Sequence, residues 1–180
     1  MIHFAITVIL FLFCLAVIYG ALCDIRTYTI PNRVSYGLVG LCAVFGTLVW
    51  LNTPYFPHMG FYITPILFNV AYGLAVFIFF LVFWKLGWVG GGDVKFVSAI
   101  SLFMGLDDVL VFVILMSVIA VAMVFVLKML PNLTPVLWHQ RMPQFVKNMV
   151  SQADNKAIPY GLPAAIAALI VIPDVMSKYY

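Results

Sequence analysis

The chain has 180 residues, of which 66% are hydrophobic and only 8% charged, with a formal net charge of +3. This composition excludes a soluble globular domain, in which about 25% of residues are charged. A transmembrane β-barrel is excluded as well, because residues 2–22 contain no charged residue and are apolar on every face instead of alternating apolar and polar. The sequence therefore predicts an all-α membrane protein in which residues 1–180 form a single domain.

Apolar stretches alternate with short polar joints along the chain. Taken in order, the predicted helical segments are 2–22, 34–51, 65–86, 94–106, 109–130 and 158–173. A bilayer core about 30 Å thick needs roughly 20 apolar residues per helix, whereas the fourth segment, at about 13 residues, reaches only about 20 Å. We predict about six crossings, the fourth short. Either the bilayer thins there, or the residues before it, including Asp93, lie below the membrane surface.

No Lys or Arg precedes the first segment, so we expect a permanent helix and not a cleavable signal. Orientation follows from the basic residues, because cytoplasmic loops collect Lys and Arg. If both termini lie outside, Lys178 is the only basic residue on the external side. The cytoplasmic ones are then Arg26, Arg33, Lys85, Lys95, Lys128, Arg141, Lys147 and Lys156.

The longest joint, residues 131–157, lies inside in this topology. It mixes Trp138 and Phe145 with Arg141 and Lys147. This mixture fits an interfacial segment whose apolar side lies among the lipid headgroups. It fits an ordinary connecting loop equally well.

The three cysteines, Cys14, Cys23 and Cys42, form no C-x-x-C pair. Neither a disulfide framework nor a zinc site is therefore indicated. We expect these thiols to pack in the core. No metal and no cofactor are predicted.

The chain contains six aspartates and no glutamate. Ionisable groups at membrane depth are costly and are candidates for function. Asp107, Asp108 and Asp174 belong to the external edge and Asp154 to the long joint, where we expect solvated surface positions. Asp24 and Asp93 differ, because they lie at the cytoplasmic ends of helices beside turn-forming residues.

Each of these two aspartates has a structural explanation when taken alone. Asp24, in "CDIRTYTIPNRV", can anchor a helix end or cap the turn at Pro31 and Asn32. Asp93, in "WVGGGDVKF", can be the N-cap of the fourth helix, with the three glycines forming the turn before it. Neither explanation accounts for two such carboxylates on one face of the membrane.

A pair of carboxylates held close together offers a chemical explanation. Two such groups share a proton: the ionised one acts as general base on a water molecule, and the protonated one polarises a carbonyl. Such a pair hydrolyses peptide bonds without a metal. Gly90, Gly91 and Gly92 have no Cβ, so a substrate backbone can approach closely beside Asp93. We therefore predict that Asp24 and Asp93 meet an extended peptide at this loop.

Three stretches resemble the motifs of the type IV prepilin peptidases, which are polytopic aspartic proteases of bacteria with archaeal relatives. "GGGDVK" matches the family's G-x-G-D-x-K pattern. "DIRTYTIPN" resembles its first motif, an Asp followed six to seven residues later by I-P-N, and "IPYGLPAA" resembles its last-helix I-P-x-G-x-P pattern. The resemblance covers essentially the whole chain in motif order and spacing.

The resemblance implies that Asp24 and Asp93 are the catalytic pair of an aspartic endopeptidase in the bacterial inner membrane. The implied substrates are pilins or pseudopilins with a short basic leader followed by an apolar helix, cut on the cytoplasmic side after a glycine. We expect this protein substrate and the lipid bilayer as partners, and no nucleic acid. The oligomeric state is left open.

The resemblance implies lesser roles for the other motif residues. Lys95 either orients Asp93 or the substrate carbonyl, or anchors the cytoplasmic end of its helix. The remaining residues are expected to shape the walls of the site: Gly90, Gly91, Gly92, Pro31, Asn32, Pro159, Gly161 and Pro163.

The chain departs from the larger family members in one respect. Those carry an inserted cytoplasmic domain after the first helix, often with paired C-x-x-C motifs, and they also methylate the new N-terminus. Here Asp24 follows the first segment almost directly, so the resemblance gives no support for methylation. In its compact size the chain is similar to the short peptidases that accompany tight-adherence (Flp-type) pili.

Two other classes compete with this interpretation. In a proton-coupled transporter, Asp24 and Asp93 would be relay groups on an ion path, although we find no mirrored motifs before and after residue 90. A presenilin-like intramembrane protease would share G-x-G-D, but its first aspartate follows a tyrosine within a helix, whereas Asp24 follows Cys23.

Overall fold

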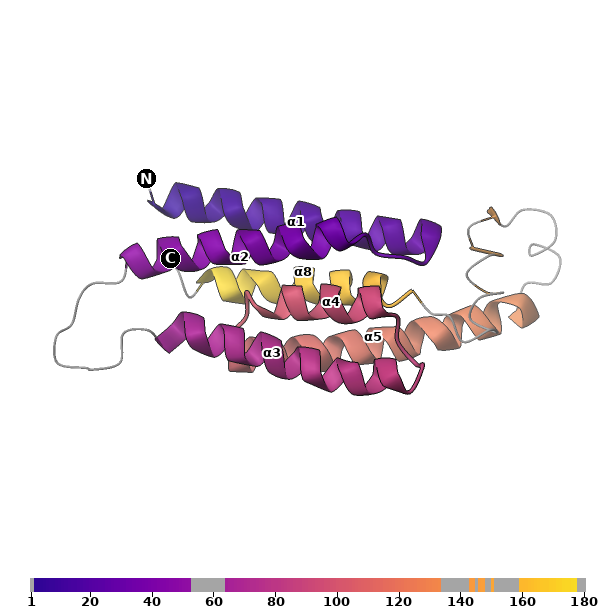
Figure 1. Cartoon of the computed structure of the whole chain (residues 1–180). Helices are drawn as coiled ribbons and strands as arrows, with labels where there is room; N and C mark the ends of the chain where they lie inside the picture. The colour runs from indigo at the N-terminus through magenta and orange to yellow at the C-terminus, as the bar shows by residue number, and fades with distance from the viewer. Residues whose placement is uncertain are drawn as a thin grey trace.

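The computed structural model describes residues 2–52, 64–133 and 159–177, together with residues 143, 144, 146, 147 and 150. This part of the chain contains helices and no strand. In chain order the helices are α1 (Ile2–Thr27), α2 (Asn32–Asn52), α3 (Thr64–Lys85), α4 (Gly91–Ser101), α5 (Leu106–Leu133) and α8 (Gly161–Ser177). They lie roughly parallel in one bundle (Figure 1). The predicted all-α class is confirmed.

Four of these helices, α1, α2, α3 and α5, are long and apolar enough to cross a membrane. Their outward faces carry many exposed large apolar side chains, as expected where lipid is the solvent. The other two are shorter, since α8 has 17 residues and the 11 residues of α4 span about 16 Å. Crossings by α4 and α8 stay predictions.

Helix ends differ from the predicted segments at two places that matter for the site. Helix α1 continues to Thr27, so Asp24 lies within its last turn and not beyond it. The turn that follows begins with Tyr28 in a left-handed conformation, with φ of 52°. Helix α4 begins at Gly91, with Gly90 as its N-cap and Asp93 as its third residue. The alternative that Asp93 is the N-cap is therefore wrong.

Helix α4 packs against α2, α3 and α8, and from Val94 onward only Lys95 on this helix is exposed. Its Phe96 is fully buried and lies over Gly20 of α1, where a Cβ atom would come within 2.6 Å of the ring. At the other end of α4, the rings of Phe13 and Phe103 lie 4.5 Å apart, centroid to centroid. The short helix α4 is thus buried among longer helices.

The aspartates predicted to be solvated behave differently from one another. Asp107 and Asp174 are exposed, but Asp108 is only 6% exposed. That expectation is wrong for Asp108, because it lies in the first turn of α5 facing the bundle. Asp154 and most of the 131–157 joint lie outside the described residues, so both interpretations of that joint stay open.

One end of the bundle collects the three sequence motifs. There α1 and α3 end, while α2, α4 and α8 begin (Figure 1). The helix directions alternate so that stretches far apart in sequence meet, as the parity of the crossings predicts. On which side of the membrane this end lies stays a prediction.

Candidate active site

Asp24 is held by an amide from the opposite end of the chain. Its side chain is only 3% exposed, and its Oδ2 accepts a hydrogen bond of 2.6 Å from the backbone N–H of Gly161, the first residue of α8. A buried carboxylate needs such a donor, because burying an unpaired charge is costly. Gly161 is therefore a direct partner of Asp24, beyond the wall role predicted for it.

Only glycine fits at position 161 in this arrangement. A Cβ atom there would lie 2.7 Å from Oδ2 of Asp24 and 2.9 Å from its Cβ. Distances this short are not tolerated between non-bonded atoms, so any side chain would displace the carboxylate. The glycine of the third motif thus fixes the side chain of the first.

Asp93 is held by its own loop. It is 9% exposed, and its Oδ2 accepts a hydrogen bond of 3.2 Å from the N–H of Gly90, the residue before α4. This is the reciprocal bond that a third helical residue makes to the N-cap backbone. The charges of Asp93 and Asp24 are close enough to interact, so the two predicted catalytic carboxylates lie at one site.

The first and second motifs also touch each other directly. A Cβ at Gly92 would lie 3.4 Å from the backbone oxygen of Ile30, so the absence of a side chain lets α4 approach the loop after α1. Lys95 donates a hydrogen bond of 3.1 Å from Nζ to Oδ1 of Asn32, at the start of α2. Lys95 therefore links α4 to α2, and a role toward Asp93 or the substrate carbonyl stays a prediction.

The other predicted wall residues surround this site unevenly. Pro159 and Pro163 are buried at the start of α8, whereas Pro31 is exposed before α2. Gly91 lies beside Trp84 of α3, whose indole nitrogen would be 3.3 Å from a Cβ at this position. Their roles in shaping the site stay predictions.

Tyr160 is a site residue that the motif pattern did not single out. It is half-buried between Pro159 and Gly161. Burial, and then the charge of Asp93, raise the pKa of its phenol above the usual value. Its position between Pro159 and Gly161 of the third motif was the only signal in the sequence, and that signal does not distinguish a spacer from a contact.

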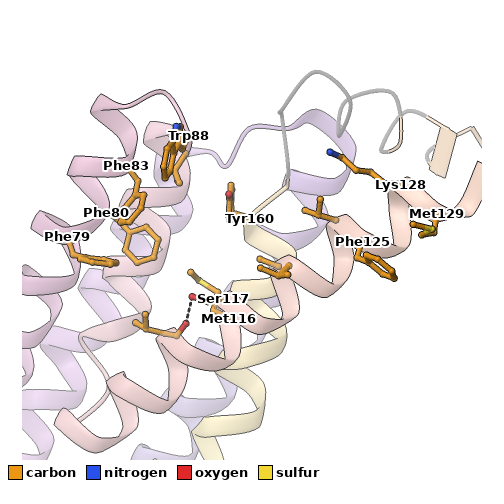
Figure 2. A pocket seen from close by; sticks show the side chains of 15 residues that line it. Phe79, Phe80, Phe83, Trp88, Met116, Ser117, Phe125, Lys128, Met129 and Tyr160 are labelled. Carbon is orange, nitrogen blue, oxygen red and sulfur yellow. Dashed lines mark hydrogen bonds between the residues drawn. The ribbon is translucent and has the colours of Figure 1, made fainter.

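A cavity of about 650 Å³ lies between α3 and α5 and reaches the loops that precede α4 and α8. Figure 2 shows Phe79, Phe80 and Phe83 on one side, Met116, Ser117 and Phe125 on the other, and Tyr160 between them. Trp88 and Val89 also line it. The cavity thus runs from the apolar flank of the bundle to the loops that hold the carboxylates.

The part of the chain that the structure describes offers no set of side chains that could bind a metal ion. No group of three or more His, Cys, Asp or Glu side chains comes together there. Cys14, Cys23 and Cys42 are free thiols. The groups available at the site are two carboxylates, backbone amides and a phenol.

Comparison with known protein families supports the resemblance found in the sequence motifs. The model of the type IV leader peptidase family matches residues 10–125, which is more than half of the chain. The chain belongs to this family. The matched range contains Asp24 and Asp93 of this leader peptidase and ends before the third motif. No curated protein and no solved structure matches the chain.

The chain belongs to a peptidase family and has four helices that are long and apolar enough to cross a membrane. It is therefore a membrane-embedded peptidase. The family match favours a peptidase over the transporter interpretation.

Proposed function

We propose that this leader peptidase is an aspartic endopeptidase that removes the short basic leader of type IV prepilins or pseudopilins. The proposal is supported above all by the convergence of Asp24 and Asp93, two buried carboxylates from α1 and α4 that interact at one end of the bundle. Each carboxylate accepts a backbone N–H, which fixes its position before a substrate arrives.

In the proposed reaction the pair carries one proton. The ionised carboxylate removes a proton from a water molecule, whose oxygen attacks the scissile carbonyl carbon, while the protonated carboxylate gives its proton to the carbonyl oxygen. The tetrahedral intermediate then collapses: the C–N bond breaks, the leaving nitrogen takes the proton from the first carboxylate, and the second regains its own. No covalent intermediate with the protein forms.

The neighbouring residues have positioning roles in this proposal. Gly90 is exposed and has no Cβ, so it leaves the backbone of the second motif open to an extended peptide. Lys95 and Asn32 hold the second motif against the start of α2 through their hydrogen bond. We propose no methyltransferase activity.

The location of the reaction follows from the basic residues. With both termini outside, the end that carries Asp24 and Asp93 lies on the cytoplasmic side of the bacterial inner membrane. A leader with basic residues is retained on that side for the same reason. The substrate is then cut where its leader meets the membrane.

The decisive experiment is cleavage of a co-expressed prepilin by the wild type, Asp24→Asn and Asp93→Asn, scored by loss of the leader on a gel. Asn keeps the size of the side chain and removes its acid–base function, so we expect each variant to lose activity by about 100-fold or more. Asp174→Asn, an exposed position on α8, is the matched control and should cleave normally. Wild-type cleavage by either site variant at normal membrane levels rejects the mechanism.

A further inference from the structure

The cavity between α3 and α5 has two unlike walls. The α3 wall is aromatic and consists of Phe79, Phe80 and Phe83. The α5 wall mixes smaller side chains, namely Ser117, Ala120, Val121 and Val124, with the larger Met116, Phe125 and Met129. Small residues on a membrane helix let another backbone approach closely. We call this cavity the α3/α5 groove.

The groove is continuous with both carboxylate-holding loops. Trp88 and Val89 line it and directly precede Gly90, whose N–H binds Asp93. Tyr160 lines it from the other loop and directly precedes Gly161, whose N–H binds Asp24. Any molecule that fills the groove therefore contacts both loops that hold the carboxylates, with Trp88 and Tyr160 at the junction (Figure 2).

The shape and chemistry of the groove favour an elongated apolar occupant. Along α5 its lining runs from Val113 to Met129, a distance of about 24 Å, against about 30 Å for the bilayer core. Both flanking helices are long enough to cross a membrane. Lys128 is the one charged residue of the lining. Such a surface suits an apolar helix over much of its length.

We propose that the α3/α5 groove docks the apolar helix of the protein substrate and so carries the peptide bond next to it to Asp24 and Asp93. This inference rests on the proposed function, because only a cleaved chain must occupy the groove and the site at the same time. A lipid chain or a helix from a second copy can fill an apolar groove, but neither needs its continuity with the loops at Gly90 and Gly161.

The test fills the groove with a bulky side chain. Val121 lines the groove and is 70% exposed, so Val121→Trp projects into it without displacing a buried residue. Val126, on the same helix and 56% exposed, lies outside the lining, and Val126→Trp is the matched control. Two substrates are used: a full-length prepilin, and a short peptide that contains the leader and cleavage site without the apolar helix.

We expect the ratio of the full-length rate to the short-peptide rate to fall about tenfold in Val121→Trp and to stay unchanged in Val126→Trp. An unchanged ratio in both variants overturns the proposal. If the wild type cleaves neither substrate, it is the proposed function that fails, which is a separable result.

A second measurement does not depend on the tryptophan variant folding. A photo-crosslinking residue at position 121 in the Asp93→Asn background is irradiated with full-length prepilin present. Cross-links to the apolar helix of the prepilin support the groove as its docking site. Cross-links only to lipid, or only to a second copy of the chain, overturn it.

Discussion

Gly161 combines two properties that a side chain would destroy. Its N–H lies 2.6 Å from Oδ2 of Asp24, and its missing Cβ leaves room for the same carboxylate. Sequence patterns treat glycines of this kind as turn formers. Here the glycine is instead part of the environment that positions a proposed catalytic group.

Replacing this glycine gives a sharp prediction at the residue scale. In Gly161→Ala the new Cβ would lie 2.7 Å from Oδ2, so Asp24 must move, and we expect leader cleavage to fall about 100-fold, the cost of misplacing a reacting group by about 1 Å. The measurement is the rate of leader loss at matched membrane levels.

Gly40→Ala is the control for that variant. A Cβ at Gly40, on α2, meets no atom within 4 Å, so its rate should equal that of the wild type. Equal rates in Gly161→Ala and Gly40→Ala would show that the contact with Asp24 does not position it.

At the scale of helices, the contact between α1 and α4 depends on one missing side chain. Phe96 is fully buried over Gly20, with ring carbons 2.6 and 2.8 Å from a hypothetical Cβ. Because the ring is enclosed and cannot move aside, we expect Gly20→Val to destabilise the bundle by about 1–3 kcal/mol.

Thermal unfolding in detergent measures this loss as a lower Tm. The matched control is Gly40→Val, which introduces the same side chain at an open position of α2 and should leave the Tm nearly unchanged. Adding Phe96→Leu to Gly20→Val should restore part of the loss. A Tm for Gly20→Val equal to that of Gly40→Val would contradict the close contact of Phe96 with Gly20.

Helix identity was predictable from the sequence, because runs of about 20 apolar residues leave few alternatives. The ends of the helices were less predictable. Asp24 is polar, and a polar residue near Pro31 suggests that the helix has stopped, yet α1 continues to Thr27. The carboxylate is tolerated inside the helix because Gly161, 137 residues away, supplies its donor. No local pattern encodes that distant contact.

The charged residues of the candidate site could be predicted from the sequence, whereas its apolar surroundings could not. Two isolated carboxylates stand out in a chain with few charges, and the parity of the crossings brings them together. Tyr160 and the α3/α5 groove carry no such contrast, since an aromatic or aliphatic residue in this chain is the commonest kind. Asp108 was misassigned because its burial depends on how α5 begins.

For the whole molecule, the orientation in the membrane yields a prediction that needs no enzyme assay. In a variant with Cys14, Cys23 and Cys42 replaced, single cysteines are introduced as Lys178→Cys or Lys85→Cys. Because basic residues concentrate on the cytoplasmic side, a membrane-impermeant maleimide should label intact cells only at position 178. Position 85 should become reactive after permeabilisation. The reverse pattern would place the end that carries Asp24 and Asp93 outside.

The hydrogen bond between Asp24 and Gly161 also bears on how the protein is made. Helix α1 is synthesised first and α8 follows α5, so a chain still on the ribosome has its first carboxylate long before the amide that fixes it. If Asp24 is catalytic as proposed, we expect cleavage competence to arrive only with α8. A nascent peptidase is then expected to be inert while its own apolar helices enter the membrane, and a product truncated before α8 is expected to lack a working site.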